Sequence, residues 1–218
     1  MSIQKQSRGL KTKMNLLNAA KQLFHDKGFS KTSAKQICEL ANVKPSNFNY
    51  YFESKEKLLQ EIYSEIFMKS YSFVESNLTY KVNSIEKNVL SAHTYVMGLF
   101  KDEQTIAFHY ETLLRESPAV FLGNNFRHVY KQFYRDLNRS VTSLELANLI
   151  NADIGMRREL FIYFIEHPGE QELTDLVNFL HIFRGRLLQM DENIMKSYLF
   201  NAYEFERNYD HSHIYLLV

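Results

Sequence analysis

Hydrophobic residues between positions 28 and 59 recur at helical spacing in short runs that polar turn residues separate. The first run predicts a helix with one narrow buried face and comprises Ala34, Ile37, Cys38 and Ala41. Thr32 or Ser33 can cap its start, and Asn42 suits the left-handed turn that follows. Pro45 fits the first turn of a second short helix, where its missing N–H costs nothing. Two short helices joined by a tight turn form a helix-turn-helix.

The remaining pattern predicts a long connecting helix followed by a bundle. An earlier helix covers about 10–27, and Ser54 caps one that continues to about residue 78. Further helices are predicted at about 84–101, 104–115, 118–140, 144–151, 153–167, 170–189 and 191–208. We therefore expect an all-α protein with an N-terminal three-helix helix-turn-helix domain (1–53). A long helix joins it to a larger C-terminal helical bundle domain (54–218).

Composition narrows the class of protein. Seven Gly and three Pro in 218 residues favour long helices over a many-turned β structure. One cysteine, Cys38, excludes a disulfide framework and suits a reducing cytoplasm. The N-terminus has no signal-peptide pattern, and no apolar run approaches the length of a membrane span. We expect a cytoplasmic protein that does not associate with membranes.

The net charge of +1 conceals an asymmetry along the chain. Residues 1–60 hold eleven Lys or Arg and four Asp or Glu, whereas the rest holds fifteen basic and twenty-one acidic residues. A basic module on an acidic body suggests that one end binds nucleic acid.

Four short motifs lie in the same order in the N-terminal region. They are Phe24-His25-Asp26-Lys27-Gly28-Phe29, Thr32-Ser33, the run from Val43 to Phe52, and Ser54-Lys55-Glu56-Lys57-Leu58. On these motifs, roughly residues 11 to 60 resemble the DNA-binding domain of the TetR family of bacterial transcriptional regulators. Asn49 stands where that family commonly has Tyr, and Tyr51 where it often has His. The resemblance implies a dimeric regulator that binds operator DNA.

The start of the second short helix carries the predicted base contacts. An α-helix fits the major groove of DNA and meets base edges with its N-terminal residues, which here are Lys44, Pro45, Ser46 and Asn47. By resemblance, Lys35 also occupies a position that can reach a base. Hydroxyl, amide and ammonium donors nearby are predicted to contact phosphates: Ser33, Asn49, Tyr50, Tyr51 and Lys55.

One recognition helix reads only a few base pairs, so useful affinity requires a symmetric dimer on a pseudo-palindrome. The last two predicted helices carry broad apolar stripes that could form a four-helix interface. The candidate interface residues are Leu176, Leu180, Phe183, Leu187, Tyr198 and Ala202. The alternative is that both stripes pack within one chain. The apolar end of the tail at 210–218 could likewise pack on the body or on a partner.

The segment from 92 to 135 is rich in aromatic residues, which line many apolar pockets and fill solid cores equally well. The ligand candidates are Tyr95, Phe100, Phe108, His109, Phe126 and Tyr130. No phosphate loop, nucleophile elbow, H-E-x-x-H or paired-cysteine motif is present, so we predict no catalytic site, metal or cofactor.

Three functions remain open from the sequence. The leading hypothesis is a repressor that a small, mostly apolar ligand releases from a palindromic operator. The second is a DNA-binding protein whose body binds a protein partner, with no small-molecule effector. The third is a helical enzyme or stress protein in which the DNA-binding module is incidental.

Overall fold

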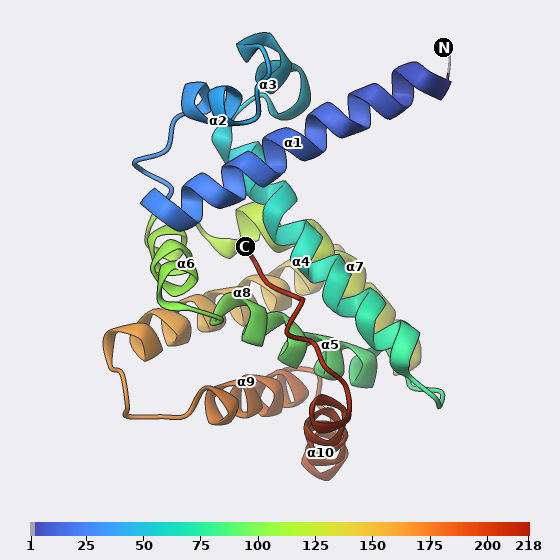
Figure 1. The fold of residues 1–218 in the computed structure, drawn as a ribbon. Helices are drawn as coiled ribbons and strands as arrows, with labels where there is room; N and C mark the ends of the chain where they lie inside the picture. The colour runs from blue at the N-terminus through green and yellow to red at the C-terminus, as the bar shows by residue number, and fades with distance from the viewer. Residues whose placement is uncertain (1–2) are drawn as a thin grey trace.

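The computed structural model describes the backbone of residues 3–218 and the side chains from residue 9 onward. Over this range the chain is all-α, as the sequence predicted, and forms ten helices and no strand (Figure 1). The helices are α1 (Ile3–Lys27), α2 (Ala34–Leu40), α3 (Pro45–Phe52), α4 (Lys55–Asn77), α5 (Ser84–Leu99), α6 (Glu103–Arg115), α7 (Pro118–Asp136), α8 (Ser143–Glu166), α9 (Leu173–Leu187) and α10 (Glu192–Asn208).

The local signals that set the N-terminal helices are present in the structure. Ser33 caps α2 in a capping box, because its side chain accepts from the Gln36 N–H while the Gln36 side chain accepts from the Ser33 N–H. Ser54 caps α4 with its side chain, which accepts from the Lys57 N–H. Gly28 and Asn42 adopt left-handed backbone angles, with φ of 81° and 53°, and end α1 and α2 respectively.

The expected break near residue 152 is wrong. A single helix, α8, replaces the two predicted at 144–151 and 153–167. The segment contains neither Pro nor a helix-ending Gly at that point, and Asp153 pairs with Arg157 one turn later along the same helix.

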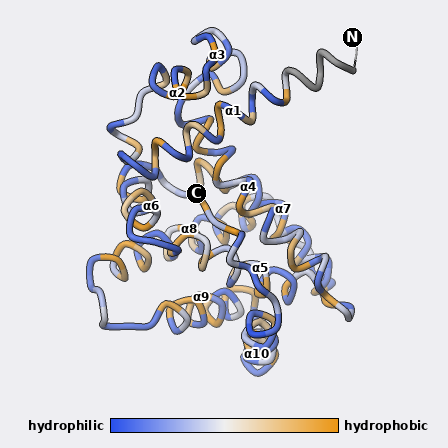
Figure 2. The backbone as a smooth tube through the Cα atoms, viewed as in Figure 1, coloured by the Kyte–Doolittle hydropathy of each residue, from blue (hydrophilic) through white to orange (hydrophobic). Residues whose placement is uncertain are grey.

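The helix-turn-helix helices α2 and α3 sit with α1 at one end of the molecule, and α4 runs from them into the body (Figure 1). In the body, α4 packs against α5 and α7, and α8 packs against α6 and α7. Hydrophobic and hydrophilic residues alternate along the helices, as expected where each has one buried face (Figure 2). Phe24 of α1 stacks on Phe108 of α6 with ring centroids 5.2 Å apart, so the two ends share a continuous core.

The C-terminal tail returns across the body towards the N-terminal end (Figure 1). Ile214, Leu216 and Leu217 are buried, and the Leu216 N–H donates to the Gly98 carbonyl at 3.1 Å. A Cβ at position 98 would lie 2.7 Å from the Ile214 carbonyl oxygen, so only glycine allows this close approach. The tail is therefore part of the core of its own chain.

Within residues 3–218, no helix is both long enough and apolar enough to cross a membrane.

Candidate nucleic-acid interface and ligand cavity

Helix α3 presents its N-terminal residues to solvent and buries its other face. Lys44, Pro45 and Ser46 are exposed, and Asn47 is half-buried beside them. On the opposite face, the rings of Phe48 and Phe52 are almost fully buried and hold the helix against the core of the N-terminal region. The arrangement leaves the first turn of α3 free to enter a groove.

Five further predicted contacts lie along the same end of the molecule. Asn49 is exposed, and the Tyr50 ring is 78% exposed with the Tyr51 ring against its edge at 4.9 Å. On α2, the Lys35 ammonium reaches solvent and pairs loosely with Glu39 at 3.9 Å. Ser33 is exposed, although its hydroxyl also caps α2.

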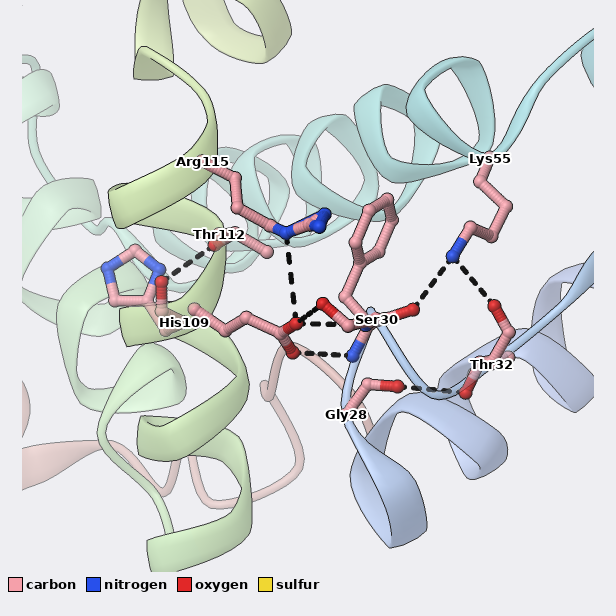
Figure 3. A network of polar contacts seen from close by, with 9 residues as sticks. Gly28, Ser30, Thr32, Lys55, His109, Thr112 and Arg115 are labelled. Carbon is pink, nitrogen blue, oxygen red and sulfur yellow. Dashed lines mark hydrogen bonds and ion pairs between the residues drawn. The ribbon is translucent and has the colours of Figure 1, made fainter.

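Lys55 differs from the other predicted phosphate contacts. Its ammonium donates to the backbone carbonyls of Phe29 and Thr32 at 2.8 and 2.7 Å, and it lies over the Phe29 ring at 4.2 Å (Figure 3). Burial lowers its pKa. The side chain turns towards the loop between α1 and α2, where carbonyls outside a helix need hydrogen-bond donors. The Phe29 carbonyl also accepts from the Thr32 N–H at 3.3 Å. The structure therefore gives Lys55 a loop-anchoring contact where we expected a phosphate contact.

Glu111 of α6 binds the same loop from the body, at Ser30, which is labelled in Figure 3. The Glu111 carboxylate accepts from the backbone N–H of Phe29 at 2.7 Å and of Ser30 at 2.9 Å, and also from the Ser30 hydroxyl. Burial acts to raise the pKa of Glu111, but these hydrogen bonds and nearby Arg115 outweigh it and lower the pKa. A charged group of the body thus fixes the start of the helix-turn-helix.

His109 and Thr112, which lie on either side of Glu111 in the sequence of α6, take part in a buried hydrogen-bond chain. The Tyr63 hydroxyl of α4 lies 2.8 Å from His109 Nδ1 and 2.7 Å from the Thr112 hydroxyl. The Thr112 hydroxyl in turn donates to the His109 carbonyl at 2.7 Å. Burial lowers the His109 pKa to about 3, so this imidazole is neutral at physiological pH.

A cavity of about 60 Å³ lies in the body, with mostly apolar walls from α4 to α9. Three of the predicted ligand residues, Tyr95, His109 and Phe126, line it. Phe100 packs on His109 and Phe161 next to those walls, with ring centroids 6.0 and 5.5 Å apart.

Phe108 and Tyr130 lie outside the cavity lining, contrary to expectation. Phe108 is buried against Phe24 of α1, and Tyr130 is buried with its hydroxyl donating to Asp153 at 3.1 Å. Phe108 is adjacent to His109 in α6, so its ring faces another direction. Tyr130 lies one turn after Phe126 on α7, beyond the cavity lining.

A buried ionic cluster borders the cavity and was not predicted. Asp153 Oδ1 accepts from Arg157 Nε at 2.9 Å, and Oδ2 accepts from Arg184 Nε and Nη2 at 3.0 and 2.7 Å. Burial would raise the Asp153 pKa, but the two guanidinium groups outweigh it and lower the pKa. The i, i+4 spacing of Asp153 and Arg157 could have indicated that pair. Arg184 is distant in the sequence and gave no such signal.

Three of the six residues predicted to form the dimer interface are buried within their own chain. Leu176, Leu180 and Ala202 are at most 2% exposed and pack within their own chain, so they are closed to a second copy. Phe183, Leu187 and Tyr198 are half-buried, and the Tyr198 hydroxyl accepts from Asn83 at 2.6 Å. The large hydrophobic side chains that are exposed on α9 and α10 are instead Phe179, Ile194, Phe200 and Tyr203.

In the part of the chain that the structure describes, no group of three or more His, Cys, Asp or Glu side chains could hold a metal ion.

Comparison with known proteins supports the interpretation of the N-terminal region. Residues 16–62 match the family model described as "Bacterial regulatory proteins, tetR family". The chain is 26% identical over 203 residues to the "Probable HTH-type transcriptional regulator YttP" of Bacillus subtilis (strain 168), covering 93% of this chain and 84% of that protein. It is 24% identical over 159 residues to the "Biofilm operon icaADBC HTH-type negative transcriptional regulator IcaR" of Staphylococcus aureus (strain Newman), covering 71% and 80% of the two chains.

Solved structures share the fold at low sequence identity. The crystal structure of RolR in complex with resorcinol superposes with a TM-score of 0.56 at 15% identity, covering 88% of this chain and 95% of that one. The TetR regulator TylP of Streptomyces fradiae gives a TM-score of 0.53 at 15% identity, covering 90% and 98%. Residues 16–62 are therefore a DNA-binding domain of the TetR kind, and the chain as a whole is similar over most of its length to transcriptional regulators that carry this domain.

Proposed function

We propose that this protein is a dimeric repressor that a small, mostly apolar ligand releases from a palindromic operator. The observation that carries the DNA-binding part is the exposed first turn of α3, braced from behind by buried Phe48 and Phe52. In the major groove, Asn47 can pair with adenine and Lys44 can donate to guanine, while Pro45 can contact a thymine methyl group. Because its target is chromosomal DNA, we expect the protein to act in the cytoplasm.

The side chains around α3 suit the phosphate backbone. Asn49, Tyr50 and Tyr51 offer amide and hydroxyl donors beside the recognition turn, and Ser33 lies at the start of α2. Such donors fix the position of a protein on the duplex without reading its sequence. Lys35 is sufficiently exposed to reach either a base or a phosphate. We also propose a domain division at residue 53. The division is one of role, because residues of the two parts pack in one continuous hydrophobic core.

We assign dimerisation to α9 and α10, with a second copy of the chain as the partner. The exposed apolar side chains Phe179, Ile194, Phe200 and Tyr203 lie on these two helices. Four helices, two from each chain, would cover these side chains and place two recognition helices for two half-sites.

The cavity and the Glu111 contact together support ligand-controlled release. His109 and Leu113 of α6 line the cavity, and Glu111 between them binds the loop that leads into α2. The cavity holds roughly four water molecules, so an organic ligand must displace its walls. A ligand that favours the displaced state shifts the population away from the DNA-binding geometry. RolR of the same fold holds resorcinol, and IcaR is named as a negative regulator.

The test is DNA binding across a salt series, with the fragment upstream of the gene for this protein as the first target. A repressor dimer gives two chains per site, a steep salt dependence and clear preference over random duplex. Binding no tighter than to random DNA at every salt concentration, with one chain per site, would contradict the proposal.

A further inference from the structure

The walls of the cavity carry an unbalanced charge. Asp153 is fully buried and, among the described residues, is the one carboxylate that contacts Arg157 or Arg184. These two guanidinium groups are 8% and 3% exposed, and both line the cavity. Arginine stays protonated in proteins, so the cluster of two arginines and one aspartate has a net charge of +1 inside the protein.

The two arginines differ in how well they are satisfied. Arg184 donates Nε and Nη2 to Asp153 and Nη1 to the Asn88 side chain. Arg157 donates Nε to Asp153, but its buried Nη2 has no hydrogen-bond partner among the described residues. A buried, unpaired guanidinium donor is costly, and here it belongs to a residue that faces the cavity.

The hydrogen-bond chain of Tyr63, Thr112 and His109 determines the tautomer of His109, a second polar residue of the cavity wall. The Thr112 hydroxyl donates its proton to the His109 carbonyl, so it accepts from the Tyr63 hydroxyl. The Tyr63 oxygen is then left to accept from His109 Nδ1. Neutral His109 therefore has its proton on Nδ1 and a free acceptor at Nε2. His109 is 3% exposed and lines the cavity, and its Nε2 has no partner in the described part of the chain.

We propose that the cavity binds a small organic carboxylate that also carries a hydroxyl group, such as an aromatic hydroxy acid. The carboxylate accepts from Arg157 and the hydroxyl donates to His109 Nε2, while the ring lies between the apolar walls formed by Phe121, Phe126 and Phe161. A guanidinium group matches a carboxylate in geometry. One carboxylate balances the single excess positive charge, whereas a doubly charged phosphate would overshoot it.

This inference rests on the proposed function in that it names the class of the releasing ligand. It is tested by calorimetry on the free full-length protein, without DNA. The probes are the ortho, meta and para hydroxybenzoates and the hydroxyphenylacetates, each beside its primary amide and beside benzoate or phenylacetate. The hydroxy acid that binds best is expected to exceed both its amide and its unhydroxylated acid by about tenfold or more.

The variants assign the contacts. Arg157→Gln is expected to weaken the best acid by about tenfold or more and its amide much less. Arg157→Lys, which keeps the positive charge, is expected to lose less affinity for the acid than Arg157→Gln. His109→Phe is expected to abolish the advantage of the hydroxyl group. The control is Arg186→Gln, an exposed arginine of α9 that pairs with Glu192; it should leave all affinities unchanged.

Several results would overturn the inference. One is equal affinity for acids and amides in wild-type protein, which does not depend on whether any variant folds. Another is absence of binding by every probe, which would mean that the cavity holds water only. Failure of the proposed function is distinct: there the hydroxy acid binds the free protein with the expected Arg157 dependence, yet operator DNA is not bound or not released.

Discussion

Glu111 Oε2 in the middle of α6 lies 2.7 Å from the backbone nitrogen of Phe29, at the start of the loop that leads into the helix-turn-helix. The two residues are 82 positions apart in the sequence. Their hydrogen bond joins the helix that lines the cavity to the segment that leads into α2, and this contact is the one through which we propose that a ligand acts on the DNA-binding helices.

We predict that Glu111→Gln lowers the response to a ligand. The amide keeps one acceptor oxygen but presents an N–H₂ group to one of the two backbone N–H donors, so one hydrogen bond is lost and about 1 kcal/mol of stability with it. The ligand concentration needed to release operator DNA should rise roughly five-fold or more. DNA-binding titrations with and without ligand measure this. Glu103→Gln at the exposed start of α6 is the control and should leave the response as in wild type.

Lys44 and Lys55 should respond differently to removal of their charge. Lys44→Ala is expected to reduce the slope of log affinity against log salt by about 0.9, the value for one lost phosphate or base contact that releases a counterion. Lys55→Ala is expected to leave that slope unchanged and to lower the melting temperature, because Lys55 holds the carbonyls of Phe29 and Thr32. A flatter salt dependence in Lys55→Ala would restore Lys55 as a phosphate contact.

The Asp153 cluster should dominate the stability of the body. Asp153→Asn removes the charge shared by Arg157 and Arg184, and leaving buried guanidinium groups uncompensated costs about 3–5 kcal/mol. Urea denaturation measures the loss. Arg186→Gln, which breaks the exposed pair with Glu192, should cost at most about 1 kcal/mol. Equal effects of the two substitutions would show that the buried cluster contributes no more than a surface pair.

The free energy of unfolding should decrease as the pH is lowered, because His109 takes up a proton in the unfolded chain but not in the folded protein. The folded pKa of His109 is about 3, below its usual value of 6.5. Protonation therefore favours the unfolded state, and stability decreases as pH falls from about 6.5 towards 3, by at most about 1.4 kcal/mol per pH unit from this residue. Buried His181, whose pKa is also lowered, acts in the same direction.

His109→Phe should remove its share of this slope, as measured by denaturation at a series of pH values. Tyr63→Phe is the matched control: it deletes the hydroxyl partner but keeps the imidazole buried, so stability drops while the slope persists. A slope in His109→Phe equal to that of wild type would contradict the prediction.

The sequence determined the features that depend on neighbours in the chain. Ser33, Asn42, Pro45 and Ser54 set the ends of the short helices, because caps and turns use hydrogen bonds and backbone angles within a few residues. The apolar spacing then predicted which face of each N-terminal helix is buried. The motifs built on these positions led to the TetR family, which the comparisons support.

Only the tertiary structure decided which polar and apolar side chains meet. Lys55 turned to loop carbonyls, and Leu176, Leu180 and Ala202 entered the core of their own chain. Arg184 joined Asp153 across 31 positions, and Glu111 reached the Phe29 N–H across 82. Periodicity gives the buried face of a helix but not the helix that covers it. The cavity, its excess positive charge and its link to the DNA-binding helices therefore follow from how the helices pack.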